Sequence, residues 1–298
     1  MGATATSVQK LGNAVKKAAE SKSSSWWYTP HMAAASRAIV ERIPLVDIVL
    51  EVRDARAPWS SRCALLKNLP SSSNRIIVLN KMDLANRSQL KEWMKSSEEQ
   101  NCISYGVNSH NKENIKEIAS HPNVYVLDTP GVLPPEILDA EICSKLALTG
   151  VIADSLVGES ELAEYFLTIL NLSDEYKDWE KLSTSESEGL LLDQKRGGSE
   201  LKGSGKRQNL TDHTQDFVVR DVRRTLFRVI SSFNRKLEDE EEMSLLIELQ
   251  FRALQKAFHL PSESGEDAHT RVATKLLNLY RTGRLGHYTL DCIPGHVL

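Results

Sequence analysis

The sequence has few cysteines, no long apolar run and no large excess of charge of one sign. Its four cysteines lie far apart, at positions 63, 102, 143 and 292, and none forms a C-x-x-C pair. This spacing favours neither a zinc site nor a disulfide framework, and it is typical of a reducing intracellular compartment. No uninterrupted apolar stretch approaches the roughly 18 residues that a membrane helix needs, so no membrane span is expected.

Charge and length set broad limits on the class of protein. The chain has 298 residues, of which 41% are hydrophobic and 26% are charged, with a formal net charge of −3. This composition is typical of a soluble globular protein of one large or two ordinary domains, and it shows no overall bias toward nucleic acid. The first 42 residues are locally basic, with six basic and two acidic side chains.

The N-terminal segment, residues 1–28, is rich in Ser and Ala and poor in acidic residues. Val8, Leu11 and Val15 fall at helical spacing, which resembles a mitochondrial or plastid targeting peptide, although Lys is used in place of Arg. An ordinary disordered tail is a second interpretation. Gly2 with Thr6 also fits the myristoylation pattern. We predict a mitochondrial location, with a cytoplasmic location as the alternative.

Strand-like and helix-like segments alternate between residues 29 and 170. Apolar, β-rich runs predict strands at 45–52, 75–83, 101–109 and 124–128, and residues 86–99 are helix-like. Buried apolar strands that alternate with helices indicate a parallel α/β sheet.

The second part of the chain has a different composition. Residues 171–213 are polar and rich in Ser and Gly, which predicts a flexible linker. Apolar residues at helical spacing then predict three helices in a C-terminal all-α domain at 214–298. The predicted domains are therefore the N-terminal segment 1–28, an α/β domain at 29–170, the linker and the helical domain.

The tetrapeptide N-K-M-D closes the predicted strand at 75–83. In an N-K-x-D loop, the carboxylate of Asp83 accepts two N–H bonds from the guanine edge, a donor pair that adenine lacks. Asn80 ties neighbouring loops together, and the stem of Lys81 covers the base. Ligands bind at the carboxyl ends of parallel strands, where this loop is expected to lie. The alternative is an ordinary polar turn after a strand.

The motif D-T-P-G follows the fourth predicted strand. In a GTP-hydrolysing switch protein, Asp128 would hold Mg²⁺ through water and the amide of Gly131 would meet the γ-phosphate. The stretch G-V-N-S places Asn108 and Ser109 where a second guanine loop is expected, although by itself it is indistinguishable from an ordinary turn.

The guanine loop at 80–83 precedes the sensor at 128–131, the reverse of the order in ordinary GTPases. This order resembles the circularly permuted GTPases that assemble ribosomes. Asp54, Ala55 and Arg56 match the D-A-R signature of that family, and residues 31–39, 145–152 and 276–291 resemble further segments of it. The alternative for D-A-R is a simple pairing of Asp54 with Arg56 at a strand end.

The resemblance implies a GTP- and Mg²⁺-dependent factor that matures the large ribosomal subunit and contacts its rRNA. We expect the chain to be a monomer. It also implies a catalytic histidine near the N-terminus. The stretch Y-T-P-H-M makes His31 the candidate, with Pro30 where the family has Gly. A surface histidine at a helix start is the alternative.

The phosphate-binding loop that such a protein needs is missing from the sequence. The only Gly-Lys pair, Gly205-Lys206, lies in the predicted linker and is followed by Arg207 in place of Ser or Thr. In the permuted order, the loop belongs between Ser109 and Val124, where only 14 residues stand. A strand, P-loop, helix, switch and second strand need on the order of fifty residues.

The sequence therefore predicts an incomplete permuted P-loop GTPase-type sheet followed by the all-α domain. Without the central strand, residues 124–128 are expected to pair with 46–52 or to stay loosely docked. The guanine loop alone is expected to give no better than about millimolar affinity. Two functions stay open. One is a GTP-hydrolysing assembly factor, if unseen residues were restored. The other is a truncated isoform that binds rRNA or the pre-ribosome without nucleotide.

The first helix of the C-terminal domain carries a candidate RNA-binding patch. Its apolar stripe leaves Arg220, Arg223, Arg224 and Arg228 on other faces, and arginine suits phosphate because its planar fork donates two parallel bonds. The alternative is that Asp221 and the acidic run at 238–242 neutralise these arginines.

Overall fold

The structure is a computed structural model, and it describes residues 6, 8–14, 30–66, 74–111, 126–129, 131–132, 139–181, 213–261 and 266–293. The chain divides into two compact units, and each is described by itself. The sheet unit comprises Val8–Gly158, Arg281–Gly283 and His287–Leu298. The helical unit comprises Met1–Ser7, Glu159–Tyr280 and Arg284–Gly286.

Three parallel strands form the sheet, in the order β1 (Val49–Asp54), β2 (Arg75–Asn80) and β3 (Ile103–Val107). The strands expected at 75–83 and 101–109 are confirmed. The first strand begins later than expected, because Pro44 lies in the 3-10 helix η1 (Ile43–Leu45), where Leu45 is 80% exposed. Proline fixes its own backbone angle and donates no N–H, so it disfavours pairing there.

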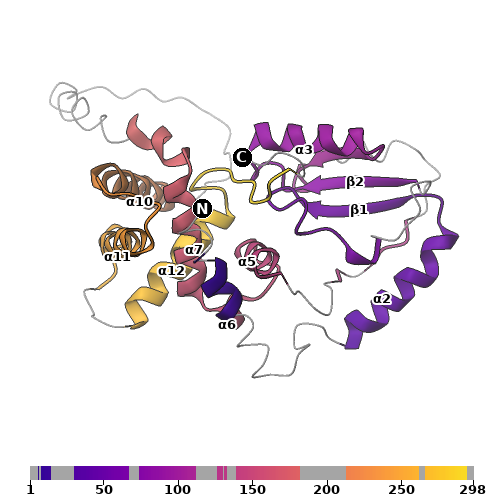
Figure 1. The fold of residues 1–298 in the computed structure, drawn as a ribbon, viewed down its shortest axis with the longest axis horizontal. Helices are drawn as coiled ribbons and strands as arrows, with labels where there is room; N and C mark the ends of the chain where they lie inside the picture. Colours follow the sequence, from indigo (N-terminus) through magenta and orange to yellow (C-terminus); the bar gives the residue numbers. More distant parts are fainter. Residues whose placement is uncertain are drawn as a thin grey trace, which may run out of the picture. The chain divides into compact units, whose positions relative to one another are not determined.

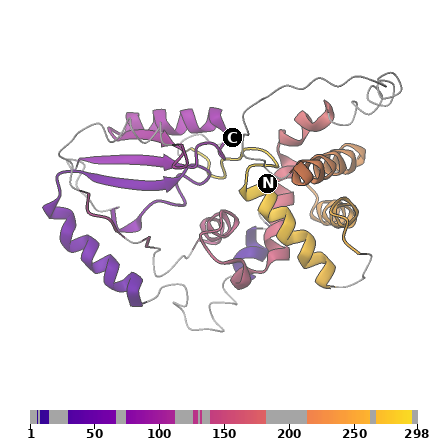
Figure 2. The ribbon, with the colours of Figure 1, turned by 180° about the vertical axis from the view of Figure 1, so that it is seen from behind.

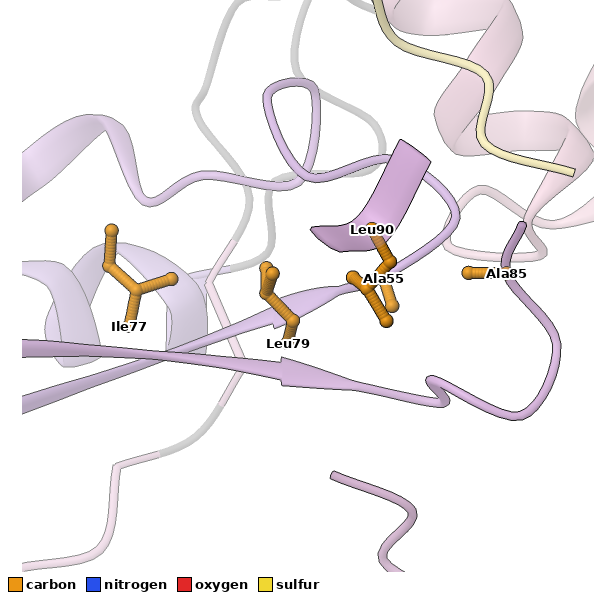
Figure 3. Close-up of a cluster of buried hydrophobic side chains, with 5 residues drawn as sticks. All are labelled: Ala55, Ile77, Leu79, Ala85 and Leu90. Atoms are coloured by element: carbon orange, nitrogen blue, oxygen red, sulfur yellow. The ribbon is translucent and has the colours of Figure 1, made fainter. Parts of the chain in front are cut away.

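One face of the sheet is covered by α3 (Arg87–Glu99), which contacts β3 and runs beside the sheet in Figure 1. Asn86 begins this helix by accepting the backbone N–H groups of Ser88 and Gln89. Figure 3 shows the buried side chains between sheet and helix: Ala55, Ile77, Leu79, Ala85 and Leu90. This small core fixes the end of β2, from which the N-K-x-D loop leaves.

The opposite face of the sheet is apolar and poorly covered. The strand register places Leu50, Ile76 and Ile103 in one row, and Val52, Val78 and Tyr105 in the next. In the described part of the chain, the outer four of these side chains remain about half exposed: Leu50 47%, Val52 62%, Ile103 56% and Tyr105 45%. We call this surface the open sheet face. An apolar sheet face of this kind normally packs against a further layer.

The prediction of a fourth strand at 124–128 is wrong for residues 126–128, the part that the structure describes. Residues 126–129 belong to no strand, and Val126 is 76% exposed; residues 124–125 lie outside the described residues. No pairing with β1 is found among residues 126–128. A strand gains stability only from a partner's backbone hydrogen bonds and side chains, and the expected central neighbour is missing from the sequence.

Further helices complete the sheet unit: η2 (Ala64–Leu66), α2 (Pro30–Arg42), α5 (Ala140–Leu148) and α6 (Asp154–Val157). Residues 8–14 are helical, as their periodicity predicts, and Leu11 is buried. Gly12 lies so close to α5 that an added Cβ would be 2.4 Å from that of Ala140. The N-terminal segment therefore contributes packing to the described sheet unit.

The helical unit contains α7 (Glu159–Leu172), η3 (Glu175–Trp179), α10 (His213–Ser232), α11 (Glu240–Ala257) and α12 (Glu266–Arg281). The last residue of α12, Arg281, belongs to the sheet unit. Figure 1 and, from behind, Figure 2 show these helices as a bundle. Phe166 is fully buried and packs on Tyr280, with 4.6 Å between the ring centres. The three C-terminal helices predicted from periodicity are confirmed.

The helical unit also contains residues that the sequence analysis assigned to the α/β domain and the linker. α7 is apolar around most of its surface, and Trp179 of η3 is 5% exposed. A helix that is apolar on most sides is stable only when buried. The proposed linker is then confined to residues 182–212, which lie outside the described residues.

Within the described ranges, no helix combines the length and apolar character needed to cross a membrane.

Candidate functional site

The N-K-x-D loop and the loop after β3 meet at the carboxyl ends of their strands. The side-chain oxygen of Asn80 accepts the backbone N–H of Ser109 at 3.1 Å, and the N–H of Met82 donates to the carbonyl of Val107 at 3.1 Å. The structure thus brings together Asn80, Lys81 and Ser109, as the sequence predicts for a guanine site. Each of these hydrogen bonds involves at least one backbone group, so the backbones of the two loops are held together.

Asp83 is positioned to accept a ligand. Its side chain is exposed, and among the described residues no group donates to its carboxylate. Asn108 is half-buried, and its side-chain oxygen accepts the N–H of His110 at 2.9 Å, which shapes the second loop. The Asp83 carboxylate can accept two N–H bonds, and the edge of guanine carries two N–H donors. The residues present therefore fit the base of a guanine nucleotide.

The D-A-R segment forms a tight, buried turn after β1. The carboxylate of Asp54 accepts the backbone N–H, Nε and Nη2 of Arg56 at 2.7–3.0 Å, and Lys81 Nζ at 3.0 Å. Burial by itself would raise the pKa of Asp54, but the hydrogen bonds and charge of Arg56, with the Lys81 charge, outweigh it and hold this pKa below its ordinary value. The pairing of Asp54 with Arg56 is therefore real, and it extends to the N-K-x-D loop.

A buried cluster that sequence reasoning missed holds the other end of this turn. The carboxylate of Asp291 accepts the backbone N–H groups of Trp59 and Ser60 at 2.8 Å, the Ser60 hydroxyl at 2.7 Å and Lys145 Nζ at 3.0 Å. Its backbone carbonyl accepts the indole N–H of Trp93 at 3.4 Å. The only sequence signal was that residues 145–152 and 276–291 both resemble family segments.

The described residues do not assemble the phosphate side of the predicted site. Asp128 and Gly131 are exposed, and a Cβ added at Gly131 would meet nothing within 4 Å. His31 is exposed in the first turn of α2. Across the described ranges, no three His, Cys, Asp or Glu side chains converge on a point where a metal ion fits. Asp128 alone does not make a magnesium site, because Mg²⁺ needs several oxygen ligands in octahedral geometry.

The four arginines predicted to bind RNA differ in their surroundings. Arg220 and Arg228 are exposed, whereas Arg223 donates from Nε to the carbonyl of Arg284 at 2.7 Å and Arg224 lies 3.6 Å from Asp221. Asp221 thus offsets part of the positive charge of these arginines, as the alternative interpretation expected.

Arg224 and Arg228 line a groove between α10 and α11, of about 740 Å³, which we call the basic groove. Its lining also includes the acidic Asp221, the apolar Val229, Phe233 and Leu249, and the basic Arg252, Lys256 and His259. Sequence periodicity missed these last three residues because it concerns one helix at a time.

The parallel sheet, with an N-K-x-D loop at its carboxyl edge and a later D-T-P-G motif, indicates the class of guanine-nucleotide-binding α/β proteins in permuted order. No protein-family model matches the chain. Among known proteins, "DAR GTPase 2, mitochondrial" of Arabidopsis thaliana is 46% identical over 358 aligned positions, covering 95% of this chain and 94% of the relative. "Ribosome biogenesis GTPase A" of Bacillus pumilus is 28% identical over 67% of this chain and 95% of its own length.

The chain belongs to the DAR-type circularly permuted GTPase family. The 358 positions aligned with the Arabidopsis protein exceed the 298 residues of this chain, so at least 60 of them have no residue here. Among solved structures, the GDP-bound structure of TM YlqF matches with a TM-score of 0.47 and 17% identity, over 86% of this chain and 98% of that one.

Proposed function

We propose that this chain acts in the maturation of the large ribosomal subunit in mitochondria and that it binds guanine nucleotide only weakly. The relatives' names, with "mitochondrial" in one and "ribosome biogenesis" in the other, support the setting, as does the acid-poor N-terminal segment. One observation supports the weak binding: the N-K-x-D loop leaves Asp83 exposed, while only 14 residues separate Ser109 from Val124, too few for a phosphate loop.

The proposed weak affinity follows from how nucleotide binding is divided between base and phosphates. In GTPases, backbone amides of the P-loop wrap the phosphates, and its lysine and Mg²⁺ offset their charge. The base side of this site offers a few hydrogen bonds to charged groups, each contributing roughly 1.5–3 kcal/mol before the cost of association. The residues of the base side would orient guanine through Asp83, with the Lys81 stem over the ring.

We expect the purified chain to bind GDP with a dissociation constant above about one micromolar and to show no measurable GTP hydrolysis. Titration of a fluorescent GDP analogue, followed by a phosphate-release assay, measures both. Asp83→Ala is the control, because it removes the base contact without touching a buried group. Submicromolar binding that Asp83→Ala abolishes would show that the phosphates are held by residues elsewhere in the chain.

A second candidate function is nucleotide-independent binding of rRNA or the pre-ribosome by a truncated isoform. The basic groove favours it, because cationic side chains from two helices line it: Arg224 and Arg228 from α10, Arg252 and Lys256 from α11. Asp221 and Glu248 pair with Arg224 and Arg252, which leaves Arg228 and Lys256 as the side chains to test. The groove belongs to the helical unit, which keeps its own buried core, with Leu226, Leu246 and Leu254 fully buried. This unit does not depend on the missing phosphate loop.

For this second function, we expect Arg228→Glu with Lys256→Glu to weaken binding of the full chain to ribosomal RNA, with or without GTP. Each lost phosphate contact should also reduce the slope of log affinity against log salt concentration by about 0.7–0.9. Filter binding at several salt concentrations measures both effects. Lys91→Glu with Lys95→Glu on α3 is the matched control for charge. Equal losses in both pairs would remove the basic groove from RNA binding.

A further inference from the structure

The D-A-R turn and the N-K-x-D loop are joined by two direct contacts. Lys81 Nζ lies 3.0 Å from the Asp54 carboxylate, and the N–H of Ala55 donates to the carbonyl of Asn80 at 2.8 Å. Both contacts lie at the carboxyl ends of neighbouring strands, because Asp54 and Asn80 are register partners. The signature residues therefore touch the loop expected to read the base.

Lys81 has an unusual backbone conformation. Its φ of 62° lies in the left-handed region, which non-glycine residues rarely adopt and which costs of order 1–3 kcal/mol unless the surroundings hold it. The N–H of Leu84 donates to the Lys81 carbonyl at 2.9 Å, closing the turn that presents Asp83. The direction of the Asp83 carboxylate thus depends on the conformation of Lys81.

Asp54 is itself held rigidly. Its side chain is 8% exposed, its backbone N–H donates to Ser61 Oγ at 2.9 Å, and Arg56, which binds its carboxylate, also donates to the carbonyl of Thr149 at 3.1 Å. The low pKa keeps this carboxylate ionised at neutral pH. A fixed negative charge thus stands beside a flexible lysine at the point where the loop turns.

We infer that Asp54 is a positioning residue of the guanine loop, which acts by holding Lys81 in the conformation that directs Asp83 toward a base. The inference rests on the guanine site proposed above. It assigns the first residue of the D-A-R signature a role in base recognition, not in phosphate binding. The ion pair involves a lysine side chain that is 45% exposed, so it contributes little to folding stability. Its effect is expected in ligand binding.

The test uses guanosine, which has the base and no phosphates, titrated into the full chain by ligand-observed NMR. We expect Asp54→Asn and Lys81→Met each to weaken guanosine binding about fivefold or more, and to lower the preference for guanosine over inosine, which lacks the amino group that donates to Asp83. The double variant should bind no more weakly than either single one, because both changes remove the same interaction. Asp47→Asn, an exposed aspartate before β1, is the matched control.

Lys81→Arg keeps the ion pair and should bind guanosine within about twofold of the natural chain. Asp54→Asn also takes the counter-charge from the buried Arg56, so that variant can fail to fold. In that case the Lys81 variants still test the ion pair, because Lys81 is its exposed partner. Additive losses in the double variant, or Lys81→Arg as weak as Lys81→Met, would refute the positioning role while the guanine site stands. If the natural chain binds no guanosine, the guanine site itself is refuted, and the positioning role with it.

Discussion

Replacing Asp291 with asparagine is expected to lower the free energy of unfolding of the sheet unit by about 3–5 kcal/mol, the range for removing one partner of a buried ion pair. The side chains of Asp291 and Lys145 are 3% and 9% exposed. Asparagine keeps the size but leaves the Lys145 ammonium without its buried counter-charge. Its amide nitrogen also cannot accept the hydrogen bonds that one carboxylate oxygen now receives.

Urea unfolding followed by tryptophan fluorescence measures this loss, because Trp59 and Trp93 both bond to Asp291. Asp267→Asn is the matched control, since it breaks an exposed pair with Arg271 on α12 and should cost less than about 1 kcal/mol. Adding Lys145→Met to Asp291→Asn should recover part of the stability. A loss no larger than that of the control would mean that water replaces the Asp291 contacts.

The same cluster has a defined pH dependence. Burial would lower the pKa of Lys145, but the charge of Asp291 and the hydrogen bonds that the Lys145 ammonium donates to Glu141 and Asp291 outweigh it and raise this pKa above its ordinary value. A lysine whose pKa is raised by folding contributes stability that is fully present below its unfolded pKa and is lost as pH rises through the folded value. The stability that the Lys145 charge contributes should therefore be constant near neutrality and fall as pH rises through its raised pKa, which urea unfolding at increasing pH measures.

Inserting the missing segment is expected to raise the affinity for GDP about a thousandfold or more, which corresponds to about 4 kcal/mol. The insert is the stretch of the Arabidopsis DAR GTPase 2 between the positions that match Ser109 and Val124. The expected gain comes from P-loop amides around the phosphates. The inserted strand should also give residues 126–128 a partner, and the inserted helix should cover part of the open sheet face.

Titration with the fluorescent GDP analogue measures the gain, and binding of an apolar dye reports the cover of the open sheet face. The control is the same insert with its P-loop lysine replaced by alanine, which should restore the cover but not the affinity. A chimera that loses dye binding yet binds GDP no better than the natural chain would locate the defect outside the missing segment.

Sequence reasoning succeeded where the signal was local. The runs at 75–83 and 101–109 predicted strands because alternation and apolar content are properties of a few neighbouring residues. The contact of Asn80 with Ser109 followed from placing two short motifs at the same sheet edge. The predicted fourth strand failed because a strand needs a neighbour, and residues 126–128 have none in the described sheet.

The Asp291 cluster was beyond sequence reasoning because its partners are distant in the chain. Ser60 and Asp291 are separated by 231 positions, and neither residue type marks a buried pair by itself. The hydrogen-bond partner of Arg223 was missed for a related reason. Helical periodicity places it away from the apolar stripe, yet it bonds to the carbonyl of Arg284, which follows α12. Periodicity describes one helix and not what packs beside it.

The separation of Ser60 and Asp291 also has a consequence for biosynthesis. At roughly 5–20 residues per second, the ribosome makes Asp291 on the order of ten to fifty seconds after Ser60. Late in this interval the β1–β2–β3 sheet is already synthesised, while the backbone N–H groups of Trp59 and Ser60 lack their acceptor and Lys145 has only the exposed Glu141 as a counter-charge. Folding of the sheet unit is therefore finished only after the helical unit has been translated, so the order of synthesis and the order of completion are opposite.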